Sequence, residues 1–186
     1  MVLPSIQPDR LYFGQKDIQQ AVILRRLLKD LLFQHPERPE DLRVMPTGRD
    51  PHTGLALSSR NAYLSEKAKT KYAPCLYRAL RKGEKVFNDE KSADAAARIQ
   101  KTLMAARQVV LEEADRAKED GVKLDLDYIS LNDPDTLQNL EECKDKLEKV
   151  DRAIMSGALL ASDVDSSGKQ GRVTRLIDNV LLGFKM

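Results

Sequence analysis

An apolar residue recurs every three or four positions from Asp17 onward, which predicts a helix that buries one face. The stripe consists of Ile18, Ala21, Leu24, Leu28 and Leu31, widened by Val22, Leu27 and Leu32. Before it, residues 10–13 are typical of the end of a short buried strand, which Gly14 interrupts. After a polar connection, residues 42–45 predict a second short strand that ends before Pro46. Strand, helix and strand of these lengths predict a parallel βαβ unit.

The middle of the chain predicts two long helices. The apolar face of the first consists of Ala68, Tyr72, Leu76, Ala79, Gly83 and Phe87. Pro74 is expected to kink or restart this helix. Ser92 or Asp94 is a suitable N-cap for the second helix, and Gly121 is a suitable stop. The apolar face of that helix consists of Ala95, Ile99, Leu103, Ala106, Val110, Ala114 and Ala117, and its many charges are expected to be solvated.

Three strands are predicted after these helices. Residues 124–131 alternate as a half-buried strand, with Leu124, Leu126 and Tyr128 expected on one side. Residues 153–162 and 173–177 are expected to pair around a polar loop. Two helices and a three-stranded, mostly antiparallel sheet form a small α+β domain. We place the domain boundary between residues 63 and 64, which gives domains 1–63 and 64–186 in a chain of the α/β class.

Composition excludes several classes of protein. In this chain of 186 residues, 41% of residues are hydrophobic and 32% are charged, as in ordinary globular proteins. The net charge of +2 and the 5% of aromatic residues, without Trp, argue against binding to nucleic acid. No apolar run has the length of a membrane span, and no signal peptide is recognised. Cys75 and Cys143 lack the spacing of a disulfide framework, so we expect reduced thiols and a cytoplasmic protein.

The turn after the first strand offers candidate binding chemistry. In open α/β sheets, ligands bind beyond the carboxyl ends of the strands, where a helix N-terminus favours an anion. Lys16, Asp17 and Gln20 would lie on that first helical turn, next to Gly14. They offer a cation, a hydrogen-bond acceptor and an amide. From the spacing alone, Asp17 is equally well explained as a helix N-cap, and Gln20 as a solvated side chain.

A second stretch has the composition of a phosphate clamp. Ser58 and Ser59 offer small hydroxyl groups, and Arg60 offers a planar cation suited to oxyanions. The preceding loop, residues 47–54, contains another arginine. Taken alone this signal is weak, because such a tripeptide occurs by chance in many chains.

The two stretches together resemble one enzyme family. The strings FGQKDIQQ, VMPTGR and GLALSSRNAYLS, followed by APCLYRAL, LDYISLNDPDTL and RLIDNVLL, are similar to those of pantothenate synthetases, the pantoate–β-alanine ligases. This resemblance extends from about residue 6 to the end of the chain. It implies that residues 1–63 are the C-terminal part of a Rossmann-like nucleotide-binding domain.

The resemblance implies an ATP-dependent, AMP-forming amide ligase. Such enzymes condense pantoate with β-alanine through a pantoyl adenylate, using ATP and the Mg²⁺ that ATP carries. Motif matching implies that Gly14, Lys16 and Asp17 bind ATP and that Gln20 binds pantoate. It assigns the catalytic roles to Lys16, Ser58, Ser59 and Arg60, of which the last three also grip the triphosphate.

The chain departs from the family pattern in one respect. The family's HxGH signature is missing, and His35 and His52 lie in unrelated loops, where we expect them to be solvated. The chain is therefore expected to be the C-terminal part of a longer enzyme, a truncated paralogue, or one piece of a split protein. No metal site is expected, since the loop opening at Asp163 has Thr174 where a calcium loop requires Glu.

Two alternatives remain at this stage. The chain is either a non-catalytic nucleotide-binding or scaffold fragment, or part of another adenylate-forming enzyme that acts on a different acid. A lone βαβ unit leaves exposed sheet edges. We therefore expect it to pack on a missing N-terminal half-domain or on a second copy of the chain.

Overall fold

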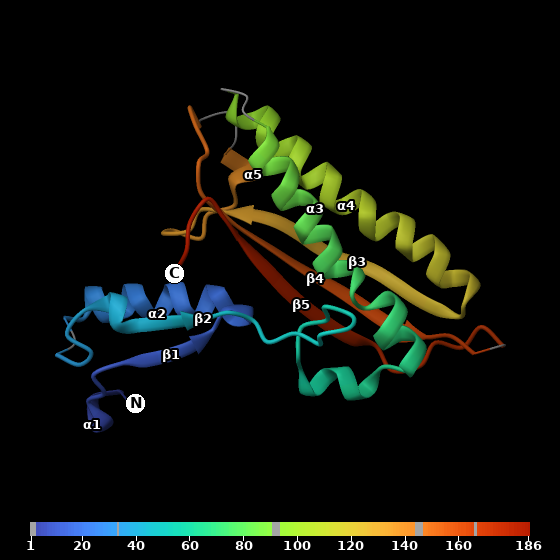
Figure 1. The fold of residues 1–186 in the computed structure, drawn as a ribbon, viewed down its shortest axis with the longest axis horizontal. Helices are drawn as coiled ribbons and strands as arrows, with labels where there is room; N and C mark the ends of the chain where they lie inside the picture. Colours follow the sequence, from blue (N-terminus) through green and yellow to red (C-terminus); the bar gives the residue numbers. More distant parts are fainter. Residues whose placement is uncertain (1–2, 33, 91–93, 144–146, 166) are drawn as a thin grey trace. The chain divides into compact units, whose positions relative to one another are not determined.

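The computed structural model describes residues 3–32, 34–90, 94–143, 147–165 and 167–186. The chain divides into two compact units. The first unit contains the residues up to Thr47 together with Met186, and the second unit runs from Gly48 to Lys185. Each unit is described by itself (Figure 1).

The first unit contains a parallel βαβ arrangement. Its elements are α1 (Leu3–Ile6), β1 (Leu11–Gly14), a 3-10 turn η1 (Gln15–Asp17), α2 (Ile18–Asp30), a second 3-10 turn η2 (Pro39–Asp41) and β2 (Leu42–Met45). Strands β1 and β2 pair in parallel, with Gly14 opposite Met45. Arg25 of α2 donates from Nε and Nη2 to the carbonyl oxygen of Leu42, at 3.1 and 2.7 Å. The predicted βαβ unit is confirmed.

Helix α2 is shorter than the predicted apolar stripe. Ile18, Ala21, Val22 and Leu28 are buried, as the periodicity indicates. Leu31 and Leu32, however, are 59% and 86% exposed, so their assignment to the stripe is wrong. The helix ends at Asp30, and residues beyond a helix end no longer follow its 3.6-residue spacing.

The two-stranded sheet has one covered face and one open face. Burial alternates along both strands, with Leu42 and Val44 buried and Tyr12 and Met45 exposed. The register places Tyr12 next to Arg43 and Gly14 next to Met45 on the open face. Helix α2 packs against both strands (Figure 1).

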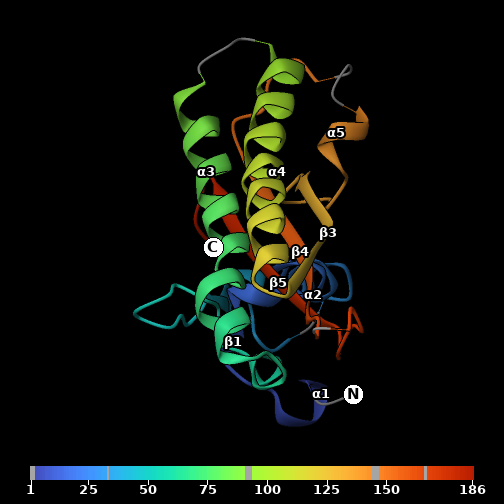
Figure 2. The ribbon, with the colours of Figure 1, turned by 90° about the vertical axis from the view of Figure 1, so that its right-hand side faces the viewer.

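The second unit is a three-stranded antiparallel sheet with helices on one face. Its strands, in the order β3-β4-β5, are β3 (Val122–Asn132), β4 (Ala153–Asp163) and β5 (Thr174–Leu182). Helices α3 (Cys75–Asp89) and α4 (Ala95–Glu119) lie side by side on that face (Figures 1 and 2). Shorter elements are η3 (Ser59–Tyr63), η4 (Ala68–Tyr72) and α5 (Leu140–Cys143). The predicted α+β arrangement is confirmed.

Both long helices bury the faces that their periodicity predicts. All six residues predicted for the first face are buried, and Pro74 precedes the restart at Cys75, after the π-helical turn η4. Asp94 caps α4 by accepting hydrogen bonds from the amides of Ala96 and Ala97, at 2.9 and 3.3 Å. Gly121, with φ of 69°, follows the end of α4, as predicted. The alternative cap, Ser92, lies outside the described residues.

One prediction about β3 is wrong because a β-bulge interrupts the strand. Leu126 pairs with Leu159, and Tyr128 pairs with Ala158, which leaves Asp127 as an extra residue. A bulge shifts the alternation by one position. Tyr128 therefore lies on the opposite face from Leu126, and Ile129 enters the core at 2% exposure.

Residues 48–63 pack within the second unit. Leu55 is buried in the core of that unit, and the amide of Leu57 donates to the carbonyl oxygen of Gly48 at 2.9 Å. The compact units thus meet between Thr47 and Gly48, whereas the sequence places a domain boundary after Tyr63. That domain boundary stays a prediction.

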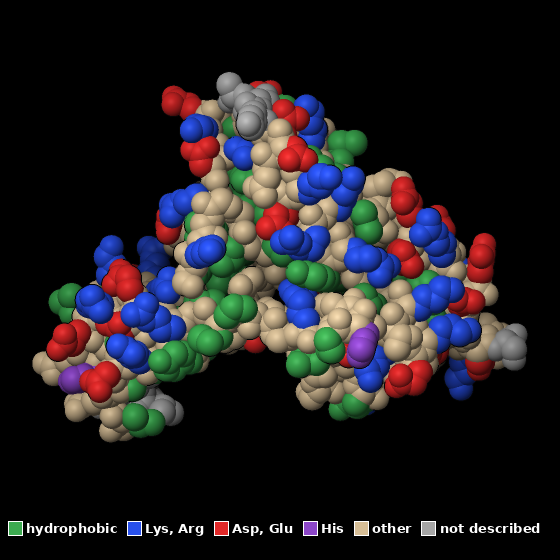
Figure 3. All heavy atoms as spheres, in the orientation of Figure 1, with side chains coloured by type: hydrophobic (Ala, Val, Ile, Leu, Met, Phe, Trp, Pro, Cys, Tyr) green, Lys and Arg blue, Asp and Glu red, His purple; other side chains and the backbone are tan. Residues whose placement is uncertain are grey.

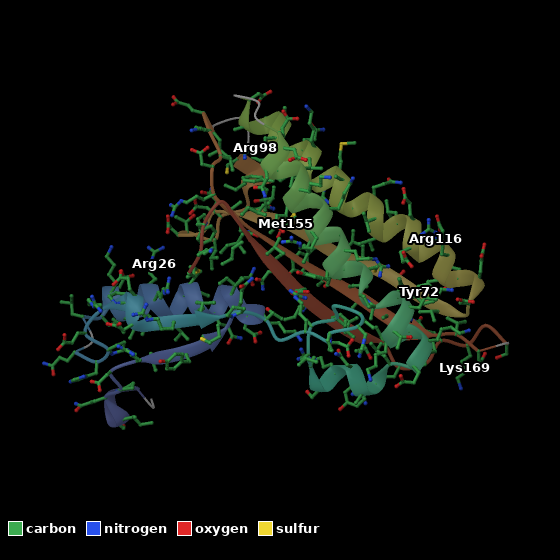
Figure 4. All side chains as sticks on the ribbon, in the orientation of Figure 1. Arg26, Tyr72, Arg98, Arg116, Met155 and Lys169 are labelled. Carbon is green, nitrogen blue, oxygen red and sulfur yellow. The ribbon has the colours of Figure 1, made fainter. Side chains whose placement is uncertain are left out.

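The surface of α3 and α4 carries charges of both signs. Figure 3 shows Lys and Arg side chains mixed with Asp and Glu over these helices. Arg98, which we expected to be solvated, instead donates to the carbonyl oxygens of Phe87 and Val150 and lies over the Phe87 ring (Figure 4). It therefore joins the start of α4 to the end of α3 and to the segment that precedes β4. Among the described helices, none has the length and apolar character needed to cross a membrane.

Candidate functional site

The first group of candidate residues lies where β1 leads into α2. Gly14 is the last residue of β1, Lys16 lies in η1, and Gln20 lies in the first turn of α2. Because β1 and β2 are parallel, their carboxyl ends meet at this edge, where ligands bind in open α/β sheets. The first unit therefore brings these residues together at the expected edge.

Gly14 lies next to open space. Its backbone has φ of −73° and ψ of 133°, a conformation that any residue adopts. A Cβ atom added here would meet no described atom within 4 Å. Neither the backbone nor internal packing requires glycine at this position, which leaves room for a ligand to approach the main chain.

Asp17 is exposed and occupies the N-cap position of α2, but its carboxylate makes no capping hydrogen bond. The structure thus does not support the explanation of Asp17 as a helix cap. Lys16 is half-buried. Gln20 is exposed and lies away from the buried residues of α2, as its position in the stripe predicts.

The second group lies at the start of η3. Ser58 is the N-cap of this turn, and its Oγ accepts a hydrogen bond from the amide of Arg60 at 3.2 Å. Ser59 and Arg60 are exposed. Asn61 is buried, and its side-chain amide donates to the carbonyl oxygen of Ala56 at 3.0 Å. The buried side chain of Asn61 thus anchors the turn to the preceding loop, while Ser59 and Arg60 lie at the surface.

A buried ion pair fixes the loop that leads to η3. Arg49 donates from Nη1 and Nη2 to both carboxylate oxygens of Asp178, at 2.6 and 2.9 Å. The side chains of Arg49 and Asp178 are 18% and 4% exposed. The Arg49 guanidinium also lies 3.5 Å from the centre of the Tyr77 ring and donates to the carbonyl oxygen of Gly54. Arg49, noted as a further cation of this loop, is therefore held by partners within the protein.

The sequence did not reveal the role of Arg49, because Asp178 lies 129 residues further along the chain. The predicted strand ends at Ile177, so Asp178, which directly follows it, is not expected to be buried. A buried charge requires a partner, but no local pattern marks Asp178 as buried or identifies Arg49 as its partner.

A second polar network joins η4 to the end of α4. Asp120 accepts hydrogen bonds from Lys71 Nζ, at 2.5 Å, and from the hydroxyl group of Tyr72. These bonds, that from Lys71 above all, lower the pKa of Asp120 to about 2. Tyr72 also donates to the carbonyl oxygen of Arg116, and Figure 4 shows both residues at this end of the helices. The network stabilises the scaffold and lies outside both candidate groups.

The remaining candidate residues are the two histidines and the two cysteines. His52 is exposed in the loop before η3, and His35 is half-buried before Pro36. Both cysteines are thiols, and burial raises the pKa of Cys75 to about 12. No group of three His, Cys, Asp or Glu side chains within the described ranges is arranged to hold a metal ion.

The two candidate groups belong to different compact units, Lys16 to the first and Arg60 to the second. Within each unit the structure brings the candidate residues together at one edge or turn. That both groups bind one anion, and that these residues have the roles implied by motif matching, stay predictions.

Comparison with known proteins gives a consistent result. The family described as pantoate-beta-alanine ligase matches residues 1–181. A bifunctional pantoate ligase/cytidylate kinase of a Synechococcus species is 40% identical over 181 residues, which cover 97% of this chain and 27% of that protein. A pantothenate synthetase of Chloroflexus aurantiacus is 37% identical over 178 residues, which cover 95% of this chain and 50% of that protein.

A third relative, a pantothenate synthetase of Thermodesulfovibrio yellowstonii, is 33% identical over 178 residues, with the same coverage of 95% and 50%. No solved structure matches the chain. The chain spans about half the length of the pantothenate synthetases that it matches, and about a quarter of the bifunctional protein.

Proposed function

Because this chain belongs to the pantoate–β-alanine ligase family, we propose that it takes part in the ATP-dependent condensation of pantoate with β-alanine. The observation that carries the proposal is the family match over residues 1–181, which includes both candidate groups. Asp17 without a capping bond and Gly14 beside open space support it. Both features leave room for a ligand beside the first turn of α2.

The reaction requires activation of a carboxylate. A carboxylate is a poor acceptor for an amine because its leaving group would be an oxide. In the first step a pantoate carboxylate oxygen attacks the α-phosphorus of ATP, which forms pantoyl adenylate and releases pyrophosphate. In the second step the amine of β-alanine attacks the acyl carbon, AMP leaves, and the nitrogen loses a proton. The protein contributes mainly by positioning the reactants and stabilising charge on the phosphates.

In the first unit, Lys16 is proposed to bind the ATP phosphates, and Gly14 and Asp17 the ribose. An exposed carboxylate without a capping bond is able to accept hydrogen bonds from ribose hydroxyls. The open space beside Gly14 permits the close approach of a nucleotide to the main chain. Gln20, exposed one turn later, is proposed to hydrogen-bond pantoate.

In the second unit, Ser58, Ser59 and Arg60 are proposed to grip the triphosphate and to stabilise the departing pyrophosphate. Ser59 and Arg60 are exposed at a turn whose base is fixed by Asn61. A guanidinium presents paired N–H groups to phosphate oxygens. Lys16, Ser58, Ser59 and Arg60 are thus the proposed catalytic residues.

Mg²⁺ is proposed to arrive with ATP. Protein sites for Mg²⁺ commonly use one or two carboxylates together with substrate phosphates. The ion is proposed to be held mainly by the triphosphate. Such an ion would neutralise part of the phosphate charge. We place the reaction in the cytoplasm, where thiols such as Cys75 and Cys143 stay reduced.

The first unit is proposed to bind a further layer of structure. Parallel sheets are almost always covered on both faces, but Tyr12 and Met45 are 62% and 49% exposed on the open face of β1 and β2. The covering layer is an N-terminal half-domain of the ligase or, alternatively, a second copy of this chain. Light scattering distinguishes these alternatives, since self-association doubles the mass of the isolated chain.

The test of the function is assembly followed by an assay. The chain is fused to the portion of the Chloroflexus aurantiacus pantothenate synthetase that it does not match, and AMP release is measured. We expect AMP only when ATP, pantoate and β-alanine are all present. Lys16→Ala is expected to lower kcat about 100-fold, whereas the control Lys29→Ala, at an exposed position of α2, leaves it within about twofold.

Two outcomes would contradict the proposal. A folded fusion that binds ATP but never releases AMP would indicate a non-catalytic nucleotide-binding or scaffold role. AMP release that depends on an acid other than pantoate would indicate a different adenylate-forming enzyme.

A further inference from the structure

Almost every arginine of the second unit has an acidic partner. Ion pairs with described carboxylates are formed by Arg49, Arg78, Arg81, Arg98, Arg107, Arg116, Arg152 and Arg175. Within the described part of this unit, Arg60 and Arg172 are the two arginines for which no ion pair is found. Both are exposed.

Turn η3 carries both Arg60 and the ring that Arg172 contacts. The guanidinium of Arg172 lies 3.5 Å from the centre of the Tyr63 ring. Tyr63 is the last residue of η3, and Arg60 precedes it by three positions. In a 3-10 helix, side chains three residues apart lie on the same face. Arg172 is therefore stacked along the face of η3 that carries Arg60.

Hydrogen bonds hold the Arg172 loop against this turn. Asp163, at the end of β4, accepts from the hydroxyl and the amide of Ser65, at 2.5 and 3.3 Å. The amide of Gly171 donates to the carbonyl oxygen of Asp163 at 2.8 Å. Both ends of the loop are thus tied to the residues directly after η3, and Arg172 follows Gly171 in sequence.

The acidic groups of this loop are engaged elsewhere. The Asp163 carboxylate is bound to Ser65. The Asp165 carboxylate accepts from the hydroxyl and amide of Ser167 and from the amide of Lys169. Neither forms an ion pair with Arg172. Two like charges near one turn repel each other, and a bound anion removes that cost.

We propose that Arg172 is a second arginine of the phosphate site and binds the same pyrophosphate or triphosphate group as Arg60. The inference rests on the proposed phosphate role of Ser58, Ser59 and Arg60. Stacking on Tyr63 fixes the plane of the Arg172 guanidinium and leaves its N–H groups at the ring edge available for oxyanions. Two planar cations bind a diphosphate more tightly than one, since each donates charge-assisted hydrogen bonds.

The test is calorimetric titration of the 186-residue chain with inorganic pyrophosphate, and then with ATP. Arg172→Met keeps an apolar side chain on the Tyr63 ring but removes the charge. It is expected to weaken pyrophosphate binding roughly 10- to 100-fold, the loss expected for a charge-assisted contact. Arg172→Lys restores part of that loss. Arg116→Ala removes another exposed cation, which is paired with Glu113, and it is expected to leave binding within about twofold.

The variants separate the two proposals. If Arg60→Ala weakens binding and Arg172→Met does not, the role of Arg172 is refuted and the proposed function stands. If neither variant matters, or the unaltered chain binds no pyrophosphate, the phosphate role of η3 is refuted and the inference falls with it.

A purely structural role for Arg172 is tested by stability. Tyr63→Leu removes the stacking platform but keeps the cation, and it is expected to weaken binding less than Arg172→Met does. If Arg172→Met binds less pyrophosphate only to the extent that it is unfolded, as measured by circular dichroism in the same buffer, the proposal is overturned.

Discussion

The two compact units differ in how completely they bury their apolar residues. The second unit has a continuous core that runs from Leu55 to Leu182 and lies between α3, α4 and the β3-β4-β5 sheet. In the first unit, the described buried hydrophobic residues are Ile18, Ala21, Val22, Leu28, Leu42 and Val44. A two-stranded sheet with one helix is marginal by itself. The second unit therefore has a core of its own, whereas the first has few buried apolar residues, in line with the proposal that a further layer covers it.

This difference bears on the two groups of candidate residues, one of which lies in each unit. Arg60 lies on a turn that the core of the second unit supports, so its position is defined within this chain. Lys16 and Asp17 lie on the unit with the open face. Functional groups on a weakly supported element are positioned only when their neighbours are complete. We therefore expect catalysis to require a first unit whose open face is covered.

The largest loss of stability is expected when the buried ion pair between Arg49 and Asp178 in the second unit is broken. Asp178→Ala leaves Arg49 without its acidic partner in a site where the Arg49 side chain is only 18% exposed. The expected loss in the free energy of unfolding is about 3–5 kcal/mol, measured by urea denaturation. Asp127→Ala, which breaks the exposed pair with Arg175, is the control and is expected to cost less than about 1 kcal/mol. Equal losses in the free energy of unfolding for Asp178→Ala and Asp127→Ala would contradict the view that the buried ion pair holds the second unit rigid.

A smaller effect on stability is expected when two glycines, one in each unit, are substituted. A Cβ atom on Gly83 of α3 would lie 2.9 Å from Sδ of the buried Met155 and 3.2 Å from Cβ of Ala106. Gly83→Leu is expected to destabilise the chain by about 1–3 kcal/mol, because the site is already filled. Gly14→Ala in the first unit is expected to change stability by less than about 0.5 kcal/mol while weakening ATP binding.

Thermal unfolding of both glycine variants checks this difference in packing. A Gly83→Leu variant as stable as the unaltered chain would show that the helix layer tolerates extra volume. A strongly destabilised Gly14→Ala variant would show that the first unit is more closely packed than the open space beside Gly14 indicates.

The smallest effect on stability is expected from the loss of the Asp120 hydrogen bonds at low pH. The pKa of Asp120 falls from its model-compound value of 3.8 to about 2 in the folded chain. Its hydrogen bonds with Lys71 and Tyr72 therefore stabilise the fold above about pH 4, and this contribution is lost as the pH falls toward 2. Asp120→Asn should lower the melting temperature at pH 6, and the difference from the unaltered chain should shrink between pH 4 and 2. A difference that stays constant over that range would contradict the assignment.

The helices and their buried faces were predictable from the sequence because burial itself produces the spacing of apolar residues. Asp94 was one of the two predicted caps, and such a cap is predictable because its side chain acts on amides only two and three residues away. The same local reasoning placed the restart of α3 after Pro74. Short-range physics therefore accounts for most of the second unit.

The errors arose where distant residues decide the structure. The bulge at Asp127 reverses the side on which Tyr128 lies, and nothing in the local alternation marks it. Arg98 appeared to be one charge among many on α4, yet it bonds to carbonyl oxygens of Phe87 and Val150. Leu31 and Leu32 were assigned to a helix that ends at Asp30.

The candidate residues likewise include some that the sequence identifies and one that only the structure reveals. The strings around Lys16 and Arg60 were found from the resemblance to one family, and the structure places each string at an edge or turn. The stacking of Arg172 on Tyr63 was not predictable. The two residues are far apart in sequence, and the contact depends on how a loop returns to η3.

Hydrogen exchange of the backbone amides, read by mass spectrometry, tests the central comparison most directly. We predict slow exchange in α3, α4 and the β3-β4-β5 sheet, and fast exchange in β1, α2 and β2 of the isolated chain. Fusion to the portion of the Chloroflexus aurantiacus pantothenate synthetase that the chain does not match should slow exchange in β1 and β2 while leaving the second unit unchanged. Equal protection of both units in the isolated chain, unaltered by fusion, would contradict the account.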